Sequence, residues 1–152
     1  MPQPLFGPEF FQRRQLAIDC AIAGVGSERQ PVDLFAYEPV EPPAAELRVI
    51  RECHARATAL GLTLPRYPKT TVQFVRGLKD TPLSAQTQAR DGVIEMAFLA
   101  GLPLDALRHV ALHELAHVDQ FARDVRLSPA ALEADAETFA WNAMHGWNGR
   151  PT

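Results

Sequence analysis

The spacing of hydrophobic residues changes several times along the chain, and each change predicts a different element. Residues 8–24 are typical of a helix, with a proline in the first turn and a glycine at the end. Residues 25–43 carry four prolines among scattered charges, which favours an extended linker. Helical spacing returns over residues 43–60, before Gly61, so we predict a second helix there.

Three short segments in the middle of the chain are typical of β-strands. Residues 70–76 are rich in β-branched side chains and alternate in character, as a half-buried strand does. Asp91 and Gly92 separate two runs that can pair, at 84–90 and 93–98. An Asp-Gly pair in this setting predicts a tight hairpin.

Two further helices are predicted after the hairpin. Residues 103–123 carry a broad apolar stripe at helical spacing. Ser128 and Pro129 then provide a capping hydroxyl and a first-turn proline, and Gly146 marks the end of the last helix. We therefore expect an α+β domain in which helices pack on a small, mainly antiparallel sheet of about three strands.

The length of the chain, 152 residues, suits one compact domain. We divide it into an N-terminal helix with its proline-rich linker at 1–43 and a core at 44–146. A hydrophobic content of 47% and a formal net charge of -3 are ordinary for a soluble globular protein. The chain has no excess of positive charge of the kind that binds nucleic acid, so we expect no nucleic-acid partner.

The N-terminus lacks the order of charged and apolar segments that a secretory signal needs. No run approaches the roughly 18 apolar residues required to cross a bilayer. We therefore expect a cytoplasmic protein without a membrane partner. The two cysteines, Cys20 and Cys53, lack the close spacing of a redox pair or a zinc knuckle, and we expect both to be reduced, buried and inert.

The predicted helix at 103–123 contains HELAH, with His113, Glu114 and His117 at the spacing H-E-x-x-H. Two histidines four residues apart lie one above the other on a helix face, so they can share a metal ion. Glu114 is rotated by about 100° from His113, which places it beside the metal as a base rather than as a ligand. The alternative is an ordinary core helix whose histidines hydrogen-bond to the backbone.

Two features of the surrounding sequence favour the metal site. Glu133 and Glu137 are four residues apart on the last predicted helix. An antiparallel return of that helix would bring a carboxylate to the two histidines. The strand ending near Phe98 comes just before the motif helix, and we expect it to lie beside the metal as an edge to which an extended peptide can add.

Residues 84–140 resemble the gluzincin-type zinc metallopeptidases, in particular the small HtpX-like, minigluzincin and ImmA/IrrE-like members. Their pattern is a hairpin strand, a leucine-rich helix with HExxH, and a following helix with E-x-x-A-(D/N/E)-x-x-A. The corresponding segments here are LDALRHVALHELAH and EADAETFA. The resemblance covers somewhat over a third of the chain. It implies a zincin-like domain with residues 44–146 as the catalytic core, a zinc cofactor and a polypeptide substrate.

The resemblance also implies a role for each matched residue. His113, His117 and Glu133 would bind zinc, and Glu114 would act as general base and proton shuttle. Glu137 falls where the family usually has Asp or Asn, a group that orients a ligand histidine. A solvated helix carboxylate is the alternative for Glu137. The family's additional group that holds the oxyanion has no counterpart here that a motif identifies.

Four other side chains near the motif are interpreted from their positions. His145 is the nearest candidate for stabilising the transition state. The segment HGW at 145–147 also faintly resembles the segment around the late histidine of SprT-like proteins, in which a third histidine replaces the glutamate ligand, so His145 is an alternative third ligand. His109 lies one turn before His113, and we expect a core or supporting histidine. Asp119 and Asp135 are expected to be surface charges.

These observations predict a zinc metallopeptidase that hydrolyses peptide bonds through a metal-activated water. Two alternatives stay open. The first is a catalytically silent zinc-binding regulatory or interaction module, which zinc binding without cleavage would indicate. The second is a latent peptidase blocked by its N-terminal segment, which cleavage only after truncation would indicate.

Overall fold

The computed structural model describes residues 33–78 and 83–147. The elements in these ranges are η1 (Leu34–Ala36), β1 (Pro39–Val40), α2 (Ala44–Ala59), β2 (Thr70–Val75), β3 (Ala85–Arg90), β4 (Val93–Leu99), α3 (Leu104–Ala122) and α4 (Pro129–Met144). The predicted helix at 8–24, residues 25–32 of the predicted linker and Cys20 lie outside the described residues. No helix within these ranges has both the length and the apolar character needed to span a bilayer.

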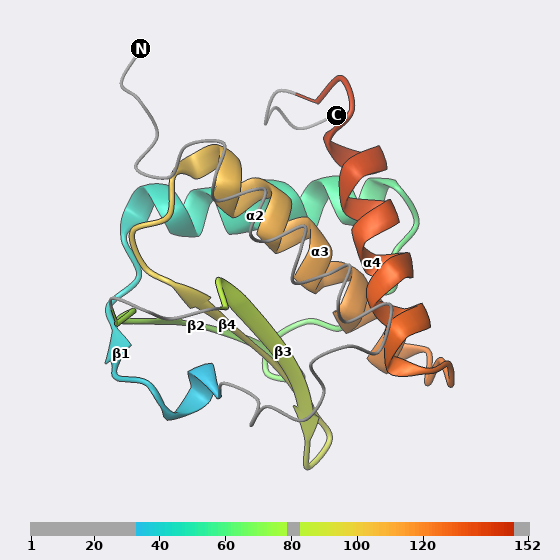
Figure 1. The fold of residues 1–152 in the computed structure, drawn as a ribbon, viewed down its shortest axis with the longest axis horizontal. Helices are drawn as coiled ribbons and strands as arrows, with labels where there is room; N and C mark the ends of the chain where they lie inside the picture. Colours follow the sequence, from blue (N-terminus) through green and yellow to red (C-terminus); the bar gives the residue numbers. More distant parts are fainter. Residues whose placement is uncertain (1–32, 79–82, 148–152) are drawn as a thin grey trace.

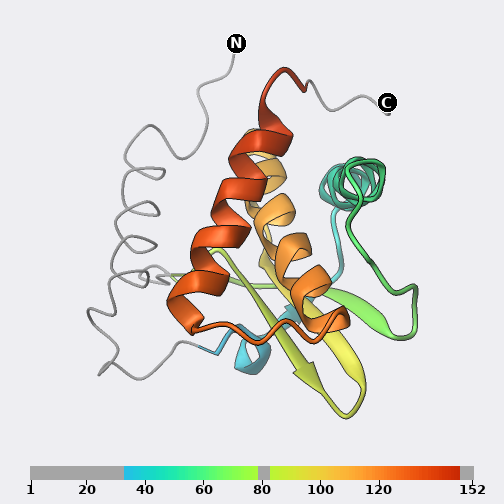
Figure 2. The same ribbon diagram turned by 90° about the vertical axis from the view of Figure 1, so that its right-hand side faces the viewer.

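The described residues form an α+β fold in which helices pack on a four-stranded sheet, as the sequence predicted. The strand order is β1-β2-β4-β3. Strands β2 and β4 run parallel, whereas the β1–β2 and β3–β4 pairs are antiparallel, so the sheet is mixed. Helices α2, α3 and α4 lie on one side of the sheet (Figures 1 and 2).

The expectation that the strand ending near Phe98 forms the sheet edge beside the motif helix is wrong. Strand β4 lies inside the sheet, between β2 and β3. Asp91 and Gly92 have φ angles of 53° and 78°, and positive angles at both positions are what a two-residue hairpin turn requires. This turn pairs β3 with one side of β4 while β2 occupies the other, so β3 is an outer strand of the described sheet, as β1 is at the opposite edge.

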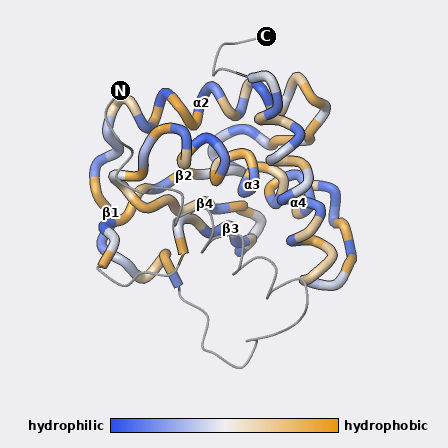
Figure 3. Tube along the Cα trace, turned by 45° about the horizontal axis from the view of Figure 1, so that its top comes forward, coloured by the Kyte–Doolittle hydropathy of each residue, from blue (hydrophilic) through white to orange (hydrophobic). Residues whose placement is uncertain are grey.

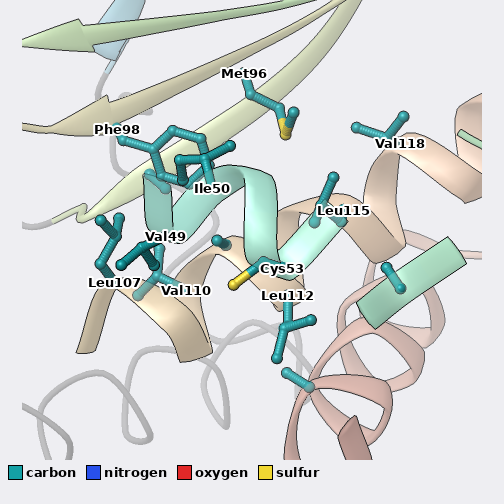
Figure 4. Packing of buried hydrophobic residues seen from close by; sticks show 14 of the residues in the cluster. Val49, Ile50, Cys53, Met96, Phe98, Leu107, Val110, Leu112, Leu115 and Val118 are labelled. Carbon is teal, nitrogen blue, oxygen red and sulfur yellow. The ribbon is translucent and has the colours of Figure 1, made fainter. Parts of the chain in front are cut away.

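One hydrophobic core joins the sheet to α2 and α3. Figure 4 shows Ile50 and Cys53 of α2 beside Leu112 of α3 and Phe98 of β4. Hydrophobic and hydrophilic stretches alternate along these helices (Figure 3), as expected where one face is buried. Burial raises the pKa of the Cys53 thiol to about 12, which keeps it protonated and agrees with an inert cysteine.

Helix α4 packs on α3 through small residues. Its buried residues are Ala136, Glu137, Ala140 and Ala143, so alanines rather than large side chains make up most of its buried face. Alanines at a helix contact allow the two axes to approach closely. The Ser128 hydroxyl accepts a hydrogen bond from the Ala131 N–H at 3.2 Å, so the helix begins where the sequence predicted.

Asp119, which we expected to be a surface charge, is buried instead. Its carboxylate accepts a hydrogen bond from the Thr63 N–H at 2.7 Å and pairs with Arg123 one turn further along α3. Thr63 belongs to the loop after α2, and this loop packs against the turn of α3 that carries Asp119. The helical pattern of α3 alone does not predict that contact. Asp135 is exposed, as predicted.

Replacement of Asp119 by alanine should lower the free energy of unfolding by about 2 kcal/mol, because its buried carboxylate ties the Thr63 backbone to α3. Asp135→Ala, the exposed control, should change that free energy by less than about 0.5 kcal/mol. Urea unfolding followed by circular dichroism measures both values. Equal values for the two variants would contradict a structural role for Asp119.

Candidate metal centre

Three histidines follow one another at intervals of one turn along α3. His109, His113 and His117 share a face of the helix because they are four residues apart. His109 and His113 are buried and His117 is partly buried. The buried part of α3 therefore carries polar side chains as well as apolar ones.

Helices α3 and α4 run antiparallel, and their contacts advance by one turn on each helix. The pairs in contact are His117 with Glu133, His113 with Glu137, and His109 with Trp141. Each step of four residues back along α3 is matched by a step of four residues forward along α4. This register brings the acidic side chains of α4 to the histidines of α3.

His113, His117 and Glu133 bring three possible ligand atoms within 4.8 Å of one another. The two Nε2 atoms are 3.2 Å apart, and the Glu133 oxygens lie 2.6 Å from His113 Nε2 and 3.1 Å from His117 Nε2. A tetrahedral zinc ion with Zn–N bonds of about 2.0–2.1 Å requires its ligand nitrogens to be about 3.3 Å apart. The donor types and the distance between the two nitrogens therefore suit a metal ion such as zinc, whereas the 2.6 Å between Glu133 and His113 Nε2 is the length of a direct hydrogen bond.

The second ring nitrogen of each of these two histidines is held from outside the cluster. His113 Nδ1 donates to Glu137 Oε1 at 2.9 Å, and His117 Nδ1 lies 2.7 Å from Gln120 Oε1. His109 Nε2 donates to the same Glu137 oxygen at 3.0 Å. These contacts direct both Nε2 atoms toward Glu133. Glu137 is only 5% exposed, so a solvated carboxylate does not describe it.

The carboxylates around the two histidines favour positive charge at this place. Burial lowers the pKa of His113, but hydrogen bonds to Glu133 and Glu137 and the charge of Glu114 outweigh burial and raise it to about 9. Burial lowers the pKa of His117 too, but the hydrogen bond to Glu133 and the charges of Glu114 and Glu133 together outweigh burial and raise it. Burial raises the pKa of Glu133, yet the two histidines hold it well below its usual range. A divalent cation satisfies the same demand for charge.

Glu114 lies between the ligand cluster and the sheet. The Thr87 hydroxyl of β3 donates to Glu114 Oε2 at 2.6 Å. The charge of Glu114 raises the pKa of both His113 and His117, although Glu114 is not a member of the ligand group. Glu114 therefore lies beside the possible ligands, on the side that faces β3.

His145 lies away from this cluster. It is the exposed C-cap of α4, twelve residues after Glu133, and twelve residues extend about 18 Å along a helix axis. Rotation around the helix alone leaves His145 about 120° from Glu133, but this axial rise separates the two residues further. His145 is therefore neither a third ligand nor a transition-state group in this arrangement.

Sequence reasoning missed two residues of the site, Thr87 and Gln120. Gln120 is three residues after His117 on one helix, so its spacing alone could have identified a neighbour of the ligand. Thr87 depends on how β3 is placed against α3, and no local pattern indicates that placement. No protein-family model, curated protein or solved structure matches the chain, so any role for these residues depends on geometry and chemistry.

The ligand assignment predicts that the purified protein binds one zinc ion. Glu133→Ala should weaken zinc binding by more than about 100-fold, because it removes a ligand, whereas His145→Ala should bind zinc as the unaltered protein does. Elemental analysis after dialysis against a chelator measures the bound metal. Loss of zinc from His145→Ala but not from Glu133→Ala would overturn the assignment.

Zinc binding should strengthen as the pH rises toward about 9, the pKa of His113, because the metal must displace the His113 proton below that pH. One displaced proton corresponds to about a tenfold change in apparent affinity for each pH unit. Competition with a chelator of known proton affinity, between about pH 6 and 8, measures this slope. An affinity that does not change with pH would contradict the protonated state of His113.

Proposed function

We propose that the protein is a zinc metallopeptidase that hydrolyses peptide bonds in an extended polypeptide. The observation that carries this proposal is a cluster of three possible ligands with a further carboxylate, Glu114, beside it. Structural zinc sites in proteins use four protein ligands, whereas catalytic sites use three and keep one position for water or substrate. Within the described residues the cluster has three members, which favours the catalytic type.

His113, His117 and Glu133 would hold the zinc ion through two Nε2 atoms and a carboxylate. Bound zinc supplies a Lewis acid that polarises a carbonyl and lowers the pKa of water. Glu137 keeps the His113 ring oriented through Nδ1. Burial of His113 excludes bulk water from one side of the cluster.

Glu114 is the general base in this proposal. Its carboxylate takes a proton from the attacking water and later delivers a proton to the leaving amine, so no protein nucleophile is required. The Thr87 hydroxyl fixes one of its oxygens and with it the direction of the carboxylate. The base is thereby held between the ligands and the strand along which a substrate would lie.

Strand β3 and the pocket next to it support a polypeptide substrate. An extended peptide can add to an outer strand through main-chain hydrogen bonds, and β3 is the outer strand of the described sheet that bonds to Glu114. A pocket of about 220 Å³ adjoins the strand and the ligands. Phe121, Val125 and Leu132 provide its apolar lining, which suits a hydrophobic substrate side chain.

Glu114→Gln should retain zinc and lower peptide hydrolysis by at least about 100-fold, because an amide cannot accept the proton. Glu38→Gln, the same change at an exposed position outside the site, should leave hydrolysis unchanged. A library of fluorescence-quenched peptides measures the rate, and mass spectrometry locates the cleaved bond. A rate of cleavage by Glu114→Gln equal to that of the unaltered protein would contradict the proposed mechanism.

An unaltered protein that binds zinc and cleaves no peptide would contradict the peptidase proposal. Removal of residues 1–32 then separates the two alternatives. Cleavage by the truncated chain indicates a latent peptidase, and continued inactivity with bound zinc indicates a silent zinc-binding module.

A further inference from the structure

Gln120 is a buried polar residue that bonds to a possible ligand on α3 and to the backbone of α4. Its Oε1 lies 2.7 Å from His117 Nδ1, and its Nε2 donates to the Leu132 carbonyl at 2.9 Å. The side chain is 5% exposed. Neither the ligand set nor the proton transfer by Glu114 uses this amide.

The Leu132 carbonyl determines which way the amide of Gln120 points. A carbonyl oxygen only accepts hydrogen bonds, so the amide nitrogen must face Leu132 and the amide oxygen must face His117. An amide oxygen also only accepts, so His117 Nδ1 must carry a proton. In a neutral imidazole the lone pair is then at Nε2, the atom that lies 3.1 Å from Glu133.

The same amide also fixes the main chain beside the third ligand, because Leu132 directly precedes Glu133 in α4. One side chain therefore connects a ligand on α3 to the backbone that carries a ligand on α4. Glu137 orients His113 as a carboxylate, whereas Gln120 orients His117 without adding charge to a cluster that already holds several carboxylates.

We propose that Gln120 is a positioning residue that presets His117 Nε2 and Glu133 for a single metal ion. This inference rests on the metal centre of the proposed function and does not depend on peptide hydrolysis. A bond to a ligand histidine from outside the coordination sphere typically contributes 10- to 100-fold, as an order of magnitude, to metal affinity.

Zinc affinity of the full chain, measured by competition with a chelator, tests the proposal. Gln120→Leu removes both hydrogen bonds and should weaken zinc binding by about 10- to 100-fold. Gln120→Glu keeps an acceptor for His117 Nδ1 but loses the donor to Leu132. Its zinc affinity should therefore lie between those of Gln120→Leu and the unaltered protein. The zinc protein should show a slowly exchanging downfield Nδ1 proton of His117 by NMR, retained in Gln120→Glu and lost in Gln120→Leu.

Asp119→Ala is the matched control, because it disturbs the neighbouring residue of α3 without touching a ligand. It should keep zinc affinity within about threefold of the unaltered protein. The proposal is overturned if Gln120→Leu keeps the zinc affinity and the Nδ1 proton signal of the unaltered protein. It is also overturned if Asp119→Ala weakens zinc binding as much as Gln120→Leu does. A protein that binds zinc but cleaves nothing, even after removal of residues 1–32, refutes the peptidase alone, whereas one that binds no zinc refutes both.

Discussion

The antiparallel register of α3 and α4 is the constraint on which the candidate site depends. The histidines of α3 recur every four residues, and so do their partners Glu133, Glu137 and Trp141 on α4, so each histidine meets its partner one turn after the last. Ala136, Ala140 and Ala143 are buried at this contact. Their small side chains allow the helices to approach until carboxylates of ordinary length reach the imidazole rings.

Close packing of these helices carries an electrostatic consequence. His109, His113 and Glu137 are almost fully buried, and unpaired polar groups in such a place would be costly. Every one of these groups has a hydrogen-bonding partner in the cluster. The carboxylates outweigh burial at His113 and raise its pKa to about 9, so the same packing that closes the site also creates a place for positive charge.

Local spacing predicted much of the fold and part of the candidate site. The helices, the strands and the Asp91-Gly92 turn follow from periodicity and turn chemistry, which act within a few residues. The close approach of Glu133 to the two histidines also follows, because it needs only an antiparallel return of α4. The burial of Asp119 and the contact of Thr87 depend on placement between elements, which short-range patterns do not encode.

Helix α3 is central because an α-helix points successive residues in different directions. Neighbouring residues are about 100° apart, so His113 can face α4 while Glu114 faces β3. The hydrogen bonds agree with this division, since His113 contacts Glu133 and Glu114 contacts Thr87. A ligand pair and a neighbouring carboxylate can therefore come from one short segment of a helix that lies between a second helix and a sheet edge. The order β3, α3, α4 meets that condition, and the proposed chemistry follows from this placement.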